Sequence, residues 1–366
     1  MVTVAEPMPE LIADPAQRPD DYLSAVLRWH FSADTGSPFW LAQAEKLDFD
    51  PLTDIGTFDD LTRFPNVANE LRSARAEDLI PRGYGPNPEV IGVFESGGTT
   101  GQPKRVVLLR DWLDQLIEWS SGQLDEHGVP TGVNWLCVIP SGPHMVGEII
   151  KRQAAYRGGM SFMVDLDPRW VKRLIEAGKF DEAGAYAEHL VEQLRHLLAS
   201  QDIGVLMITP PVLERVARDE RLVELVNEKV RAINWVGTQM DVDTRSLYRT
   251  EIFPEVRLYS GYGSTMILGN ASERVGLTDD DPCIYDPYSP HMSFRVIDPE
   301  TGEQVPYGER GQVSMTHASK SFFLPNNLER DYATRIAPPP GQVGDSVADI
   351  APVLEFDGET VTEGVY

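Results

Sequence analysis

The feature that most constrains this chain is the alternation of short apolar runs with amphipathic segments between Glu89 and Gly263. In chain order, the apolar runs are VIGVF, RVVLL, NWLCVIP, SFMVDL, IGVLMIT, AINWVG and VRLYSGYG. Runs that are apolar at nearly every position are typical of strands buried on both faces, and helices between them favour parallel connections. The pattern predicts an α/β fold around a mostly parallel sheet, with ligands beyond the carboxyl ends of its strands.

The segments before and after this core have different residue patterns. Residues 1–90 contain helical patterns such as DDYLSAVLRWHF and SPFWLAQAEKL, which begin after Asp or Ser-Pro. After Pro282 the chain becomes rich in strand-forming residues, with a hairpin expected around Pro-Glu-Thr-Gly at 299–302. We therefore divide the 366 residues into a helical part at 1–90, an α/β core at 91–281 and a β-rich part at 282–366.

The charge balance excludes several classes of partner. There are 57 acidic and 32 basic residues, for a formal net charge of −25. Because nucleic acids and anionic membranes bind positive faces, neither is expected as a partner, and an anionic ligand needs a site with its own local donors. Cys137 and Cys283 form no CxxC pair, and no metal site is predicted. The first residues lack the basic flank and apolar core of a signal peptide, so we expect a cytoplasmic protein.

A loop of glycines and hydroxyl residues follows the first apolar run of the core. It reads Ser96-Gly97-Gly98-Thr99-Thr100-Gly101 and is closed by Gln-Pro-Lys104. Glycines let several backbone N–H groups turn toward one anion, hydroxyls add donors, and Lys104 adds a positive charge. The loop is not the GxxxxGK[ST] phosphate loop. A solvated turn and an anion site both fit this composition when it is taken alone.

The order of residues in this loop resembles the phosphate-binding signature of the adenylate-forming (ANL) superfamily of acyl-CoA synthetases, aryl-CoA ligases and adenylation domains. That signature has two small residues, Gly, two hydroxyl residues, Gly, any residue, Pro and Lys. Three further segments resemble the family in the same order: IPSGPHMVGE, NWVGTQM and LYSGYGSTM. The stretches FDDLTRFPNVANELR and FRVIDPETGEQVPYGERGQV are most similar to the phenylacetate-CoA ligase branch.

The resemblance implies a nucleotide site and its residues. His144 and Gly147 would lie beside an acyl pocket, Tyr262 would stack on adenine, and Thr265 would donate to the α-phosphate. Asp345 in GQVGDSV would hold the ribose hydroxyls, with Asp331 in LERDYATR as the alternative. Lys104, Thr265 and His144 would take the catalytic roles. Besides the loop, the implied nucleotide contacts are Gly237, Thr238, Gly261, Tyr262, Gly263, Ser264, Thr265 and Asp345.

For the fold, the resemblance implies two doubly wound α/β subdomains followed by a small β-rich one, with the nucleotide in the cleft between them. For the activity, it implies ATP-dependent conversion of an aromatic carboxylic acid to an acyl-adenylate. The chain is similar to C-terminally shortened members in phenazine antibiotic pathways, which implies an aryl carboxylate and a reductase or transferase partner. We place the acyl pocket among Trp135, His144, Trp235, Tyr259 and Met266. Dimerisation stays open.

Two departures from the family pattern limit what can be carried over. Met266 stands where the family has a glutamate that helps hold Mg²⁺, and a thioether is a poor ligand for a hard cation. Magnesium use therefore depends on another carboxylate or on water. The sequence also ends where the family continues into a mobile C-terminal subdomain with a catalytic lysine. Two readings remain: an acid-activating enzyme, and a binding module that holds an aryl acid or aryl-adenylate for a partner.

Overall fold

A computed structural model describes residues 15–96, 102–278, 281–352, 355–356 and 359–360. Its main feature is an 11-stranded sheet in the order β10-β11-β12-β13-β9-β8-β7-β6-β5-β3-β4. Five neighbouring strands run parallel: β4 (Ser161–Asp165), β3 (Trp135–Ile139), β5 (Val205–Ile208), β6 (Ala232–Trp235) and β7 (Arg257–Ser264). Five of the seven apolar runs form these parallel strands, as the sequence predicts.

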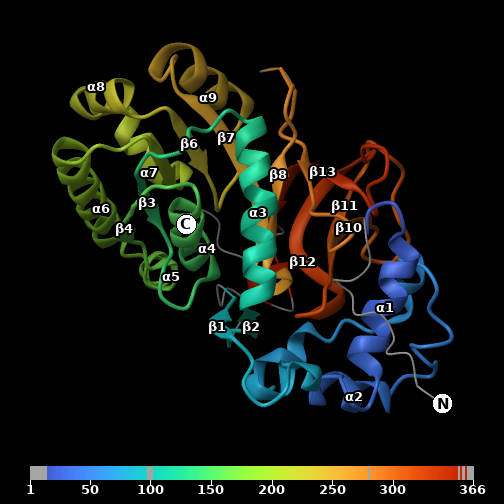
Figure 1. The fold of residues 1–366 in the computed structure, drawn as a ribbon. Helices are drawn as coiled ribbons and strands as arrows, with labels where there is room; N and C mark the ends of the chain where they lie inside the picture. The colour runs from blue at the N-terminus through green and yellow to red at the C-terminus, as the bar shows by residue number, and fades with distance from the viewer. Residues whose placement is uncertain (1–14, 97–101, 279–280, 353–354, 357–358, 361–366) are drawn as a thin grey trace.

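Helices cover both faces of this parallel part (Figure 1). Alternate residues of a strand point to opposite faces. Trp135, Cys137 and Met207 face one side, where Leu124, Val146 and Ile150 pack against them. The helices of that side are α3 (Arg110–Glu126) and α4 (Met145–Tyr156). The remaining helices of the core are α5 (Pro168–Glu176), α6 (Phe180–Ser200), α7 (Pro210–Ala217), α8 (Glu220–Lys229) and α9 (Val242–Leu247), which is followed by a π-helical turn at Tyr248–Ile252.

The first two apolar runs of the core do not join the parallel sheet. β1 (Val90–Glu95) and β2 (Arg105–Leu109) pair with each other in an antiparallel ribbon whose connection is the glycine-rich loop. Apolar composition alone does not distinguish such a ribbon from a parallel strand: β2 is buried at four of its five positions, whereas in β1 only Phe94 is buried. The ribbon places both ends of the loop next to each other.

β7 is shared between the parallel and antiparallel parts. Its residues from Arg257 to Ser260 pair with β6, and those from Gly261 to Ser264 pair with β8. The antiparallel strands are β8 (Gly269–Glu273), β9 (Tyr285–Asp286), β10 (Met292–Ile297), β11 (Arg310–Ala318), β12 (Phe323–Ile336) and β13 (Ser346–Pro352), with two short strands at Glu355–Phe356 and Glu359–Thr360. The hairpin predicted around residues 299–302 joins β10 to β11.

The expectation of two doubly wound subdomains is met for one of them. Among the described residues, parallel pairing with helices on both faces is confined to β3–β7, and the strands after β7 pair antiparallel. The physical reason lies in the connections. Strands after Ser264 are joined by short turns and a 3-10 helix at Thr265–Ile267, which leave no room for the crossover helix that a parallel pair requires.

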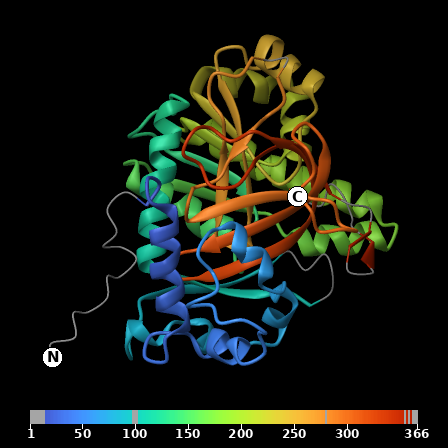
Figure 2. The ribbon, with the colours of Figure 1, turned by 90° about the vertical axis from the view of Figure 1, so that its right-hand side faces the viewer.

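The N-terminal helices α1 (Pro19–Phe31) and α2 (Pro38–Ala44) pack on the antiparallel strands, as Figure 2 shows for α1. Short 3-10 helices follow at Asp59–Arg63, Ala68–Arg72, Ala76–Leu79 and Arg82–Tyr84. The indole of Trp40 donates to the Phe323 carbonyl (2.7 Å), and Tyr22 donates to the Ala318 carbonyl (2.9 Å). The described part of the chain has no helix with both the length and the apolar character to cross a bilayer.

Candidate functional site

A cavity of about 710 Å³ lies at the carboxyl ends of the parallel strands and extends down one face of the sheet. Its lining includes residues at the ends of the β1–β2 ribbon, at the ends of β6 and β7, and in β8, β12 and β13. An apolar compartment continues from there between the sheet and the helices α3 and α4. This is the position in which open α/β sheets bind ligands.

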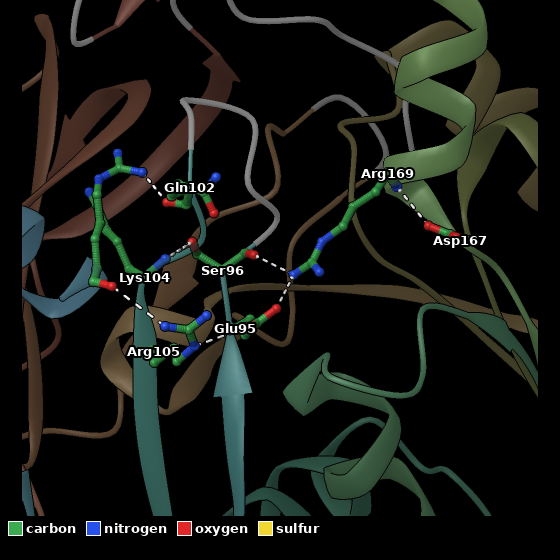
Figure 3. Close-up of polar contacts among 8 residues, drawn as sticks. Glu95, Ser96, Gln102, Lys104, Arg105, Asp167 and Arg169 are labelled. Atoms are coloured by element: carbon green, nitrogen blue, oxygen red, sulfur yellow. Dashed lines mark hydrogen bonds and ion pairs between the residues drawn. The ribbon is translucent and has the colours of Figure 1, made fainter. Parts of the chain in front are cut away.

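The base of the glycine-rich loop is tightly organised (Figure 3). The Ser96 amide donates to the Lys104 carbonyl (2.9 Å), and the Lys104 amide donates to the Ser96 hydroxyl (3.0 Å). Both residues line the cavity, and Lys104 is buried. The predicted contacts Gly97, Gly98, Thr99, Thr100 and Gly101 lie outside the described residues.

Glu95 ties this base to two arginines. Its carboxylate accepts from Arg105 (3.1 Å) and from Arg169 at the start of α5 (2.8 Å), and Arg169 also donates to the Ser96 carbonyl (3.2 Å). Burial alone would raise the pKa of Glu95, but the hydrogen bonds from the two guanidinium groups outweigh it and lower that pKa. The loop base thus carries the local positive charge that an anion site requires in an acidic chain.

His144 lies on the cavity wall as the residue that precedes α4. It is buried, and burial together with the nearby charge of Arg169 lowers its pKa. Its imidazole is therefore neutral at pH 7, which suits it to contact a carboxylate or acyl group through one N–H. Gly147 is required nearby, because a Cβ there would come within 2.9 Å of the Ser141 Cα.

The turns after β6 and at the end of β7 meet at the cavity. Gly237 and Thr238 line it, and Gly237 has a φ of 96°, a value that favours glycine. At the end of β7, a Cβ on Gly263 would lie 2.6 Å from the Gly269 carbonyl oxygen, so the two backbones approach closely. The structure brings all the residues predicted from this segment to the cavity: Gly261, Tyr262, Gly263, Ser264 and Thr265.

Two acidic side chains of β12 face these β7 residues. The Tyr262 hydroxyl donates to Asp331 (3.0 Å), and the Ser264 hydroxyl donates to Glu329 (2.6 Å). Both carboxylates line the cavity. Burial and their mutual repulsion raise the pKa of Glu329, and burial raises that of Asp331. Asp331 was considered in the sequence as the alternative ribose ligand, whereas Glu329 was missed. Neither residue follows a glycine turn, so no local signal marks them as a pair.

Asp345 does not line the cavity. It is 1% exposed, and its carboxylate accepts from the Val296 amide (3.1 Å), from Gln304 (3.0 Å) and from Arg335 (2.8 Å). The side chain is thus engaged in joining β10, the hairpin and β12. The Gly-Asp pair at 344–345 serves this packing: Gly344 has a φ of 77°, and a Cβ there would lie 2.6 Å from the Phe294 carbonyl oxygen.

The predicted acyl pocket residues divide between the two faces of the sheet. Trp135, His144, Tyr259 and Met266 line the cavity, whereas Trp235 does not. Trp235 follows Asn234, which does line the cavity, so the indole points to the opposite face and packs in the larger core. A run that is apolar throughout gives no indication of which face each residue takes.

The described residues contain no cluster of three or more His, Cys, Asp or Glu side chains arranged to hold a metal ion. Met266 is buried, at 4% exposure. Two oxygen-bearing side chains line the same cavity. The Asn327 amide donates to Glu329 (2.6 Å), and the buried Asn327 Oδ1 has no hydrogen-bond partner among the described residues. A carboxylate such as Glu329 suits Mg²⁺, which takes its remaining ligands from phosphates and water.

Comparison with known proteins begins from the sequence. No family model matches the chain. It is 24% identical over 246 residues to the D-alanine–D-alanyl carrier protein ligase of Listeria monocytogenes, and 22% identical over 269 residues to that of Listeria welshimeri. These alignments cover 65% and 72% of this chain and 43% and 48% of the relatives. The alignments thus span less than half the length of these curated relatives.

Solved structures give the broader match. The fold is similar to that of a 2-hydroxyisobutyryl-CoA ligase in its postadenylation state with an acyl-AMP, with a TM-score of 0.62 and 16% identity over 92% of this chain and 67% of the ligase. An open conformation of that ligase with acyl-AMP and CoA gives 0.63 and 15% over 96% of this chain and 79% of the ligase. At such identity the likeness concerns the fold.

Proposed function

We propose that this chain, which has the fold and distant sequence relatives of the adenylate-forming (ANL) superfamily, activates an aromatic carboxylic acid with ATP. A carboxylate oxygen would form a bond to the α-phosphorus, the bond from that phosphorus to the bridging oxygen would break, and pyrophosphate would leave. The products are an acyl-adenylate and pyrophosphate. The finer proposal is a phenazine-type or other aryl acid, whose adenylate passes to a reductase or transferase.

One observation carries the proposal. A single cavity joins the base of the glycine-rich loop, the Gly261–Thr265 turn and an apolar compartment on the sheet face. An acyl-adenylate has three corresponding parts: a phosphate, a nucleoside and an acyl group. The arrangement supports a site that holds ATP and an acid in line, and such positioning accounts for much of the rate of phosphoryl-type transfers.

The described residues suit distinct tasks. Lys104 and the hydroxyls of Ser96 and Thr265 would neutralise and orient the phosphates. The neutral imidazole of His144 would position the acid carboxylate at the mouth of the apolar compartment. Asp331, rather than Asp345, would bind the ribose hydroxyls, because it lines the cavity and contacts Tyr262.

The site also suits a magnesium ion at the phosphates. Glu329 would hold it in place of the family glutamate that Met266 replaces. When bound, the ion would screen the phosphate charge against the incoming carboxylate. The protein's own part is to hold Glu329 in position, through the donors Ser264 and Asn327.

Carboxylate-dependent exchange of pyrophosphate into ATP tests this proposal. We expect exchange with a panel of aromatic acids and none with the acids omitted. AMP binding measured by calorimetry is the independent readout. If none of the acids supports exchange and AMP does not bind, the proposal is overturned.

Met266 favours a second candidate function, a binding module that holds an aryl acid or its adenylate for a partner enzyme. The same two measurements distinguish it. A module binds AMP or a stable adenylate analogue but catalyses no exchange with any acid, whereas an activating enzyme does both.

A further inference from the structure

Two strongly basic side chains line the cavity. Among the lining residues that the structure describes, Lys104 is the only lysine and Arg330 the only arginine. Lys104 lies at the base of the glycine-rich loop, and Arg330 lies on β12 between Glu329 and Asp331. In a chain with a net charge of −25, a cavity that binds phosphates depends on such local positive charges.

Arg330 reaches the cavity because β12 is irregular at this point. On β12, Leu328 pairs with Ser314 of β11. The next paired residue, Tyr332, faces Gln312, so three residues of β12 stand opposite one residue of β11. In a regular strand successive side chains alternate between two faces, and Arg330 would be turned away from the side that its neighbours take. The bulge removes that alternation, and three consecutive side chains line the cavity.

The charge of Arg330 acts on the acidic groups beside it. Burial raises the pKa of Glu329 and of Asp331, and the guanidinium charge of Arg330 works against that rise in both. The same charge opposes the rise that burial causes in the pKa of Tyr262. The guanidinium therefore lies within electrostatic range of all three groups, which border the proposed positions of the ribose, the base and the magnesium ion.

The place of Arg330 matches that of the α-phosphate in the proposed site. That phosphate is joined to the ribose, which Asp331 would bind, and lies beside the magnesium ion that Glu329 would hold. A guanidinium presents a planar fork of N–H donors that fits two phosphate oxygens. We propose that Arg330 binds the α-phosphate and stabilises the negative charge that develops on it when the carboxylate attacks. Arg330 gives up no proton: the bond from the carboxylate oxygen to phosphorus and the departure of pyrophosphate are those of the proposed function, on which this inference rests.

Adenosine, AMP and ATP, which differ only in their phosphates, test the proposal by calorimetry. The parent should bind AMP more tightly than adenosine. Arg330→Gln should weaken AMP and ATP binding by the same factor, about 10- to 100-fold, and change adenosine affinity by less than about 2-fold. Arg330→Lys keeps the charge but not the fork, so its AMP affinity should be intermediate. An unchanged AMP affinity in Arg330→Gln, or an equal loss for adenosine and AMP, overturns the proposal.

A control variant and a second assay separate this role from the proposed function. Arg221→Gln replaces an exposed arginine on α8 and should leave all three affinities unchanged. Where an acid supports pyrophosphate exchange, Arg330→Gln should slow it by about 10²- to 10³-fold. If the parent binds AMP but exchanges with no acid, the proposed activation fails, and the AMP affinity of Arg330→Gln still decides the role of Arg330. A parent that binds AMP no better than adenosine overturns this inference, and one that binds neither overturns the proposed function with it.

Discussion

The hydroxyl of Tyr262 donates a 3.0 Å hydrogen bond to the carboxylate of Asp331, 69 residues further along the chain. The contact joins the end of β7 to β12 across the cavity. Burial, and after it the neighbouring carboxylates, raise the pKa of Tyr262, so the phenol remains a donor throughout the neutral range. A tyrosine ring held by one acidic residue is a defined surface on which a planar base can lie.

Asp331→Asn should weaken AMP binding by about 10- to 100-fold, since a hydrogen bond to a charged group is lost from the ribose. The melting temperature should change little. Asp345→Asn is the matched control: it breaks a buried ion pair with Arg335 and should lower the free energy of unfolding by about 3–5 kcal/mol. Its AMP affinity, measured where the variant is folded, should equal that of the parent. Unchanged AMP affinity in Asp331→Asn would show that the ribose is held elsewhere.

Arg169→Gln should raise the pKa of His144, because the nearby guanidinium charge contributes to keeping that pKa low. It also removes the hydrogen bond to Glu95, so ATP should bind more weakly while AMP binding is less affected. NMR shifts of the His144 ring protons, followed as a function of pH, give the pKa of His144. Calorimetry gives the affinities for ATP and AMP. Arg173→Gln, an exposed change on the same helix, is the control. A His144 titration identical in both variants contradicts this role for Arg169.

Three buried histidines should make the fold sensitive to acid. Burial lowers the pKa of His30 and His291 to about 4 and that of His317 to about 3. They are neutral in the folded chain and take up protons near pH 6.5 when unfolded, so stability is full above about pH 6.5 and falls as pH drops toward about 4. Each contributes up to about 1.4 kcal/mol per pH unit to that slope.

His291→Gln should therefore reduce the slope of unfolding free energy against pH between about pH 6 and about pH 5 by roughly 1 kcal/mol per unit. Urea unfolding at several pH values measures it. His189→Gln, on the exposed side of α6, should retain the parent slope. An unaltered slope in His291→Gln would mean that His291 is protonated in the folded state.

Magnesium should strengthen ATP binding in a manner that depends on Glu329. Burial and the charge of Asp331 raise the pKa of this carboxyl, and only its ionised form binds a cation. The Mg²⁺ enhancement should thus decline as pH falls, beginning above the ordinary value of 4.5. In Glu329→Gln, the increase in ATP affinity caused by Mg²⁺ should be about 10-fold smaller and should no longer depend on pH.

The readout for that variant is ATP affinity by calorimetry with and without Mg²⁺, from about pH 8 to about pH 5. Glu309→Gln, an exposed change in the loop before β11, is the control. Equal Mg²⁺ enhancement in parent and Glu329→Gln would assign the cation to phosphates and water alone.

Sequence reasoning reached the parallel strands and the glycine turns because both depend on local chemistry. Buried strands need apolar residues throughout, and the close approach at Gly263 admits no side chain. The sequence did not predict on which face of the sheet Trp235 lies, because a continuous apolar run has no alternation that distinguishes the two faces. The position of Asp331 opposite Tyr262 depends on how β12 folds back over β7, which no local pattern encodes.

The strand that belongs to both halves of the sheet has a mechanical consequence. Because β7 is hydrogen-bonded to β6 along its first half and to β8 along its second, the two walls of the cavity are fastened by one stretch of backbone. Separating the two walls would break backbone hydrogen bonds between strands, so β7 holds the walls at a fixed distance. In the proposed site, the register of β7 would therefore fix the distance between the nucleotide end of the cavity and its apolar compartment, and ligand entry would depend on side chains and loops at the rim.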